Sequence, residues 1–163
     1  MAKRRKKKVE RTIHLSAGPL PPRLAEQFSE CRLIFSDASQ QRHGGLAAVL
    51  FEHADSEPLV TTRTVPIIGS NELELQAAVF ALEQGSLHFP EQAVTLFSDN
   101  QDAITRLNQA KTLGPAQDPE LTSMFARLDL TALLANASLR WIKGHSNCRG
   151  NALADTHARA AAS

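Results

Sequence analysis

The sequence predicts an α/β fold in which helices flank a five-stranded mixed β-sheet, with three antiparallel strands followed by parallel strands. Short apolar runs rich in β-branched residues alternate with segments whose apolar residues recur at helical spacing. The connections between the first three runs are too short for crossovers, so those strands must be antiparallel. A length of 163 residues with 42% hydrophobic residues fits one domain with an ordinary core.

The first half of the chain should form a three-stranded meander and one helix. Leu33–Phe35 is an apolar run that predicts a buried strand ending at Asp37, and the strand that follows should cover residues 46–53. Residues 59–67 are rich in Val and Thr, which favours a third strand. A helix should begin at residues 69–71 and continue to about residue 83. Its apolar positions at i, i+3, i+4 and i+7 are Leu75, Ala78, Val79 and Leu82.

The second half should add two parallel strands and three helices. A strand ending at Asp99 follows the first helix, and a βαβ connection of this length implies a parallel arrangement. Asp118-Pro119 has the pattern of an N-cap followed by Pro at the first helical position. The remaining expected elements are helices over residues 100–111, from 118 to about 128 and over 151–162, a strand over 138–142, and a loop over 143–150.

The N-terminus differs in charge from the rest of the chain. Six of the 18 basic residues form one run, and the remainder has 17 acidic residues against 12 basic ones. A basic arm on an acidic body is typical of a nucleic-acid contact, although it can also be a solvated tail. We expect residues 1–30 to be a basic, flexible extension and residues 31–163 to be the catalytic domain. The run comprises Lys3, Arg4, Arg5, Lys6, Lys7 and Lys8.

The composition favours a soluble protein of the cytoplasm. No apolar run approaches the roughly 18 residues of a membrane span, and no signal-peptide core follows the basic start. Cys31 and Cys148 lack the spacing of metal ligands and are expected to be reduced thiols.

Four acids are candidates for a metal site, and each has an ordinary structural alternative. Asp37 and Asp99 end strands that should be parallel neighbours, which would place them side by side. Asp99 could instead be an N-cap, Glu74 could complete a capping box in the first turn of its helix, and Asp155 could be a solvated acid of a surface helix. Carboxylates that converge in a cleft repel one another unless cations neutralise them, and hard oxygen ligands select Mg²⁺ or Mn²⁺.

Five motifs resemble those of type 1 ribonuclease H, a member of the ribonuclease-H-like nuclease superfamily. The resemblance extends in order over about residues 32–162 and implies the ribonuclease-H-like fold. The motifs are Phe35–Ser39, Glu74–Glu83, Phe97–Gln101, Trp141–His145 and Asn151–Asp155.

The resemblance implies roles for individual residues. Asp37, Glu74, Asp99 and Asp155 fall on the catalytic acids, which hold two Mg²⁺ ions, with Mn²⁺ as a substitute. Glu72 is a rival to Glu74, but the Leu-x-Ala-Ala pattern that follows favours Glu74. His145 falls on a catalytic histidine that assists turnover from a mobile loop. The residues expected to contact nucleic acid are Ser39, Asn71, Gln101, Asn151 and the run from Lys3 to Lys8.

The implied activity is hydrolysis of the RNA strand of RNA–DNA hybrids by a monomeric endoribonuclease, which leaves 5′-phosphate and 3′-hydroxyl ends. Two departures are visible: the loop from Ser39 to Gly45 is short, and the basic, Trp-rich protrusion of some relatives is absent. Two alternatives remain. The protein could be another nuclease of the superfamily that acts on DNA or structured nucleic acid, or a catalytically silent hybrid-binding module.

Overall fold

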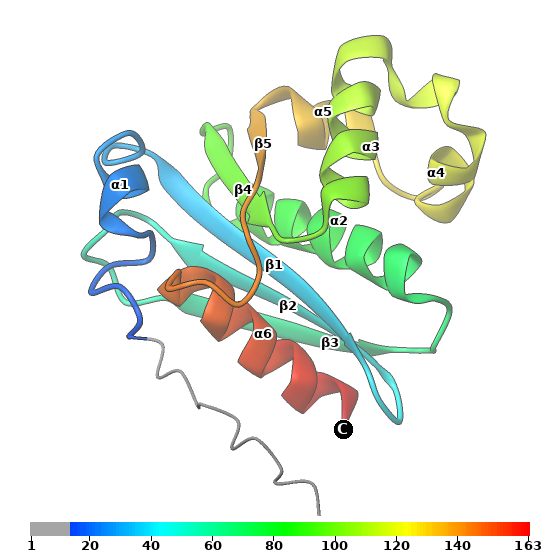
Figure 1. Ribbon diagram of the computed structural model, residues 1–163. Coiled ribbons are helices and arrows are strands. Elements are labelled where there is room, and N and C mark those ends of the chain that lie inside the picture. The colour runs from blue at the N-terminus through cyan, green and yellow to red at the C-terminus, as the bar shows by residue number, and fades with distance from the viewer. Residues whose placement is uncertain (1–13) are drawn as a thin grey trace, which may run out of the picture.

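The computed structural model describes residues 14–163, which form one mixed sheet with strand order β3-β2-β1-β4-β5 (Figure 1). Strands β1, β2 and β3 are antiparallel, and β4 and β5 join β1 in parallel. The predicted fold class is therefore confirmed. The strands are β1 Arg32–Gln40, β2 Gly44–Phe51, β3 Leu59–Val65, β4 Val94–Ser98 and β5 Ala137–Trp141.

Helices cover both faces of this sheet. Helices α2, α3 and α5 lie over one face, and α6 lies across the other face with α1 near its start (Figure 1). Among residues 14–163, no helix is long and apolar enough to cross a membrane. The helices are α1 Pro22–Ala25, α2 Ser70–His88, α3 Gln101–Leu113, α4 Pro119–Met124, α5 Leu130–Ala135 and α6 Arg149–Ala162, with a 3₁₀ turn at Pro115–Gln117.

Each face of the sheet has its own core, because successive side chains of a strand point to opposite faces. Ile34 of β1 packs into the larger core beneath α2. Phe35 packs into the smaller core beneath α6, where its ring stacks on Phe97 with centroids 5.3 Å apart. Gly150 lies directly against the Phe35 ring, and a Cβ at this position would overlap it. A glycine is therefore needed for α6 to begin this close to the sheet.

The structure corrects the expected end of the first strand. β1 does not end at Asp37 but continues to Gln40, because its hairpin pairing with β2 extends to Gln40↔Gly44. Pairing with β4, in contrast, stops at Phe35↔Phe97. On the side of β4, β1 therefore has no neighbouring strand at Asp37, although β1 itself continues to Gln40.

Two helices also differ from their predictions. Helix α2 passes through Gly85 and ends at His88, because the packing of Gly85 on Ile34 outweighs its low helix propensity. The helix expected from residue 118 to 128 ends at Met124, and α5 then begins with Asp129 as its N-cap. Phe125 and Leu128 lie in the turn that connects α4 to α5, and both are partly buried against the larger core. Their spacing matched a helix because both side chains of this turn face the core.

The described part of the N-terminal extension packs on the domain. Leu20 is buried in the core beneath α6, and α1 adds the partly buried Leu24 and Ala25 to the same core. Cys31 and Cys148 are free thiols. The boundary at residue 30 stays a prediction, and the run from Lys3 to Lys8 lies outside the described residues.

Candidate active site

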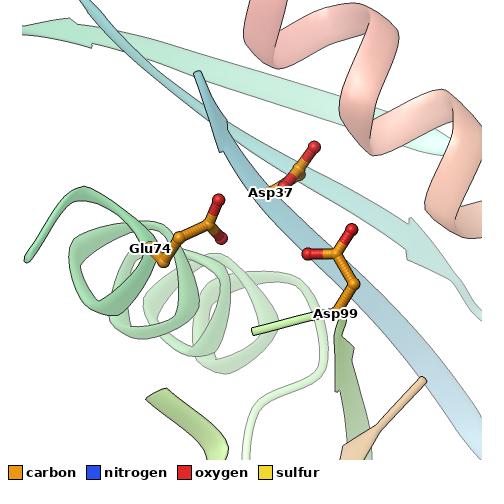
Figure 2. A group of neighbouring side chains, drawn as sticks. All are labelled: Asp37, Glu74 and Asp99. Atoms are coloured by element: carbon orange, nitrogen blue, oxygen red, sulfur yellow. The ribbon is translucent and has the colours of Figure 1, made fainter. Parts of the chain in front are cut away.

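Three carboxylates from different elements meet at one end of the sheet. Asp37 lies on β1, Asp99 directly follows β4, and Glu74 projects from α2; Figure 2 shows the three side chains gathered around one point. One carboxylate oxygen from each lies within 4.8 Å of those of the other two. The expectation that Asp37 and Asp99 lie side by side is confirmed.

The local structure leaves these acids without the ordinary roles considered for them. The N-cap of α3 is Asn100, whose side chain accepts a hydrogen bond from the Ala103 amide at 2.8 Å, so Asp99 is not the cap. Helix α2 begins at Ser70 with Gly69 as its N-cap and has no side-chain capping bond among the described residues. Glu74 therefore lies just beyond the first turn and completes no capping box.

Burial and like charge raise the pKa of all three acids. Asp37 is only 4% exposed, and burial, followed by the charges of Asp99 and Asp155, raises its pKa to about 7. Burial raises the pKa of Glu74 to about 9, with further contributions from Asp37 and Asp99. Burial likewise raises the pKa of Asp99. Each shift means that a full set of negative charges is unfavourable here unless a cation is present.

Asp155 and His145 line the same cleft, which has a volume of about 370 Å³. Asp155 lies on α6 outside the close group, and its Oδ1 forms an ion pair with Arg159 Nε at 3.2 Å. His145 is exposed on the loop between β5 and α6 and has a left-handed backbone with φ of 53°. All four predicted acids and the predicted histidine thus border one cleft.

The predicted nucleic-acid contacts within the described residues differ in exposure and in their position relative to the cleft. Asn71 is exposed in the first turn of α2, three residues before Glu74. Gln101 is exposed in the first turn of α3, two residues after Asp99. Asn151, in contrast, is only 4% exposed and donates from Nδ2 to Asp99 Oδ2 at 3.5 Å, so its side chain is directed at a carboxylate. Ser39 lies in β1 two residues beyond Asp37 and does not line the cleft.

Several neighbours of the site had no role assigned to them from the sequence. The Trp141 indole donates from Nε1 to the Asp99 carbonyl at 3.0 Å, while 47% of the residue remains exposed. Leu15 and Arg159 line the cleft together with the acids. Trp141 lies within a recognised motif and could have been proposed. Leu15 precedes the core by many residues and gave no signal.

The comparisons with known proteins agree with this architecture. The family model described as RNase H matches residues 30–163. A ribonuclease H from Ruthia magnifica subsp. Calyptogena magnifica is 31% identical over 100 residues, which cover 56% of this chain and 67% of that protein.

Solved structures share the fold at low sequence identity. RNase H1 from Halobacterium salinarum NRC-1 superposes with a TM-score of 0.56 at 20% identity and covers 79% of this chain and 98% of its own. LC11-RNase H1 in complex with an RNA/DNA hybrid gives 0.57 at 17% identity, with 81% and 99% covered. The N-terminal RNase H domain of a Mycobacterium tuberculosis protein gives 0.60 at 18% identity, with 82% and 97% covered. The resemblance to type 1 ribonuclease H is thereby confirmed, and the chain belongs to the RNase H family.

Proposed function

We propose that this protein is an endoribonuclease that hydrolyses the RNA strand of RNA–DNA hybrids and leaves 5′-phosphate and 3′-hydroxyl ends. The main support is the meeting of Asp37, Glu74 and Asp99 within 4.8 Å in a cleft that Asp155 and His145 also line. Membership of the RNase H family supports nuclease chemistry. One structural relative was solved in complex with an RNA/DNA hybrid, which supports the choice of substrate.

The residues of the cleft fit divalent metal ions. Every donor in the close group is a carboxylate oxygen, the ligand type that suits Mg²⁺. Glu74 Oε2 is buried and has no hydrogen-bond partner within residues 14–163, as expected of an atom whose partner is an ion. Asp37, Glu74, Asp99 and Asp155 would hold two Mg²⁺ ions, with Mn²⁺ as a substitute. Two bound ions supply an activated water and stabilise the attacking and leaving oxygens of an in-line displacement.

The protein's own residues position these carboxylates. Asp37 is fixed by a strand that pairs with β2 on one side. Asp99 is held through its carbonyl by Trp141 and through Oδ2 by Asn151. Asp155 would have to exchange its ion pair with Arg159 for a metal ion, which would leave a free guanidinium at the cleft. Such a group could then neutralise a phosphate of the substrate.

His145 is proposed to act on the departing group rather than on a metal ion. It is exposed on the loop that connects β5 to α6, and it lines the cleft. An imidazole at this place can donate a proton to the leaving 3′-oxygen or loosen the 5′-phosphate product. The carboxylates already supply the hard ligands, so the histidine is free for this role.

Asn71 and Gln101 are proposed to read the hybrid's minor groove and 2′-hydroxyl groups, the feature that distinguishes RNA from DNA. Both are exposed at the starts of helices whose neighbouring residues form the acid cluster. The basic run from Lys3 to Lys8 would hold the sugar–phosphate backbone. Leu15 lines the cleft, and the seven residue-to-residue steps from Lys8 to Leu15 can span at most about 25 Å, so a hybrid in the cleft is within reach. We further propose that the protein acts as a cytoplasmic monomer.

A cleavage assay on substrates of matched sequence tests this function. We expect cleavage of an RNA–DNA hybrid with Mg²⁺ or Mn²⁺, none with chelator, and little or none of double-stranded RNA or double-stranded DNA. Preferential cleavage of DNA would identify a different nuclease of the superfamily. Hybrid binding without cleavage under any divalent ion would identify a silent binding module. Either result would contradict the proposal.

A further inference from the structure

We propose that residues 14–20, here called the N-terminal strap, cap helix α6 and thereby position its side of the active site. Ser16 and Arg149 are the positioning residues. The inference rests on the proposed nuclease function for its consequence in catalysis. The strap lies outside residues 30–163, which match the family model, so this contact is an addition to the RNase H core.

Helix α6 does not cap itself. Its first amides have no acceptors within the helix, as at every helix start. The N-cap residue, Cys148, provides no side-chain capping bond in the described chain. The strap supplies the acceptors instead: Ser16 Oγ accepts from the Arg149 amide at 3.2 Å, and the Pro19 carbonyl accepts from the Gly150 amide at 2.9 Å.

Three further hydrogen bonds attach the strap at the same place. The Ser16 amide donates to the Asn147 carbonyl at 2.8 Å, and Arg149 Nε donates to the Ser16 carbonyl at 2.7 Å. Cys148 Sγ donates to the Pro19 carbonyl at 3.2 Å. Ser16 is 7% exposed and Cys148 is fully buried, so these bonds are at least partly shielded from water. A side chain and a backbone segment about 130 residues away in sequence thus fix the start of α6.

The capped segment supplies several residues of the cleft. Asn147 lies two residues after His145, and Asn151, in the first turn of α6, hydrogen-bonds Asp99 Oδ2 at 3.5 Å. Asp155 lies one turn further along the same helix. Leu15, at the start of the strap, lines the cleft itself. Loosening the cap should therefore disturb metal binding through Asn151 and Asp155 while leaving the sheet intact.

The test compares full-length Ser16→Ala with a matched control, Ser29→Ala, which changes an exposed serine of the same N-terminal region. Amide hydrogen exchange in residues 145–155 should be about 5-fold faster in Ser16→Ala, the factor expected for loss of one cap, with no change in α2. The single-turnover rate on a hybrid should fall, and the Mg²⁺ concentration that gives half-maximal rate should rise, each by about 3- to 10-fold. Ser16→Thr keeps the hydroxyl and should restore both.

The outcomes separate this inference from the proposed function. Unchanged exchange in residues 149–152 would overturn the cap, and exchange needs no substrate, so this holds even if the wild type cleaves no hybrid. Faster exchange with wild-type Mg²⁺ dependence in an active enzyme would overturn the positioning role. If Ser16→Ala does not fold, Arg149→Met, which has a side chain of similar length but no donor for the Ser16 carbonyl, is examined by the same measurements.

Discussion

Replacing Asp37 by Asn should abolish cleavage and also make the metal-free protein more stable at pH 8. Asp37 is 4% exposed, and its pKa is raised from 3.8 to about 7 by burial first and by Asp99 and Asp155 next. Because the pKa of Asp37 is higher in the folded state, the protonated carboxyl favours folding. This contribution to stability is fully present below pH 4 and is lost as the pH rises through about 7. At pH 8 the charged aspartate therefore opposes folding.

The magnitude follows from the size of the shift. One pKa unit corresponds to about 1.4 kcal/mol, so a shift of about three units sets an upper limit of about 4 kcal/mol at pH 8. The amide of Asn also needs hydrogen-bond partners, so we expect a gain of about 1 to 3 kcal/mol. For a chain of this length, this corresponds to a Tm increase of roughly 3 to 10 °C. At pH 5 the gain should shrink by more than half, because the folded-state carboxyl is by then mostly protonated.

Thermal unfolding in chelator at pH 8 and pH 5, followed by titration with Mg²⁺, measures this effect. Wild type should gain stability from Mg²⁺ by mass action, and Asp37→Asn should gain much less. Asp102→Asn, at an exposed acid of α3 outside the cleft, is the matched control and should behave as wild type. A variant less stable than wild type at pH 8, or equal gains at both pH values, would refute the electrostatic reasoning. Undiminished cleavage would remove Asp37 from the metal site.

Three further predictions concern the arm, the loop and the indole. Deleting residues 1–8 should weaken hybrid binding chiefly at low salt and lower the slope of log K against log salt by at most about 5. The rate at saturating substrate should change little. An unchanged slope would mean that the arm makes no phosphate contact. His145→Ala should retain measurable activity, with a loss of about 10²-fold, and the multiple-turnover rate should fall more than the single-turnover rate; equal losses would assign His145 to the chemical step. Trp141→Phe keeps an aromatic side chain but removes the bond from Nε1 to the Asp99 carbonyl, so half-maximal activity should require about 2- to 10-fold more Mg²⁺. An unchanged requirement would show that this bond does not position Asp99.

The sheet, its antiparallel and parallel parts, and the acids at one end of it could all be predicted from the sequence. These features follow from local patterns: apolar and β-branched runs indicate strands, helical spacing indicates helices, and connection length decides strand direction. The placement of Glu74 early in its helix, and of Asp99 directly after the buried strand that follows this helix, could be predicted for the same reason. The motifs then indicated which of the many acids to choose.

Tertiary structure decided what depends on pairing between distant segments. Asp37 borders the cleft because β4 stops pairing at Phe35↔Phe97, not because β1 ends. Asp155 pairs with Arg159 rather than joining the close carboxylate group, although the resemblance counted it among the four acids of the metal site. The cap that Ser16 provides for α6 had no sequence signal at all, because an N-cap is sought next to its helix and this one comes from a segment 133 residues away. Local periodicity contains no information on such a contact, which arises only when the chain folds back across its own sheet.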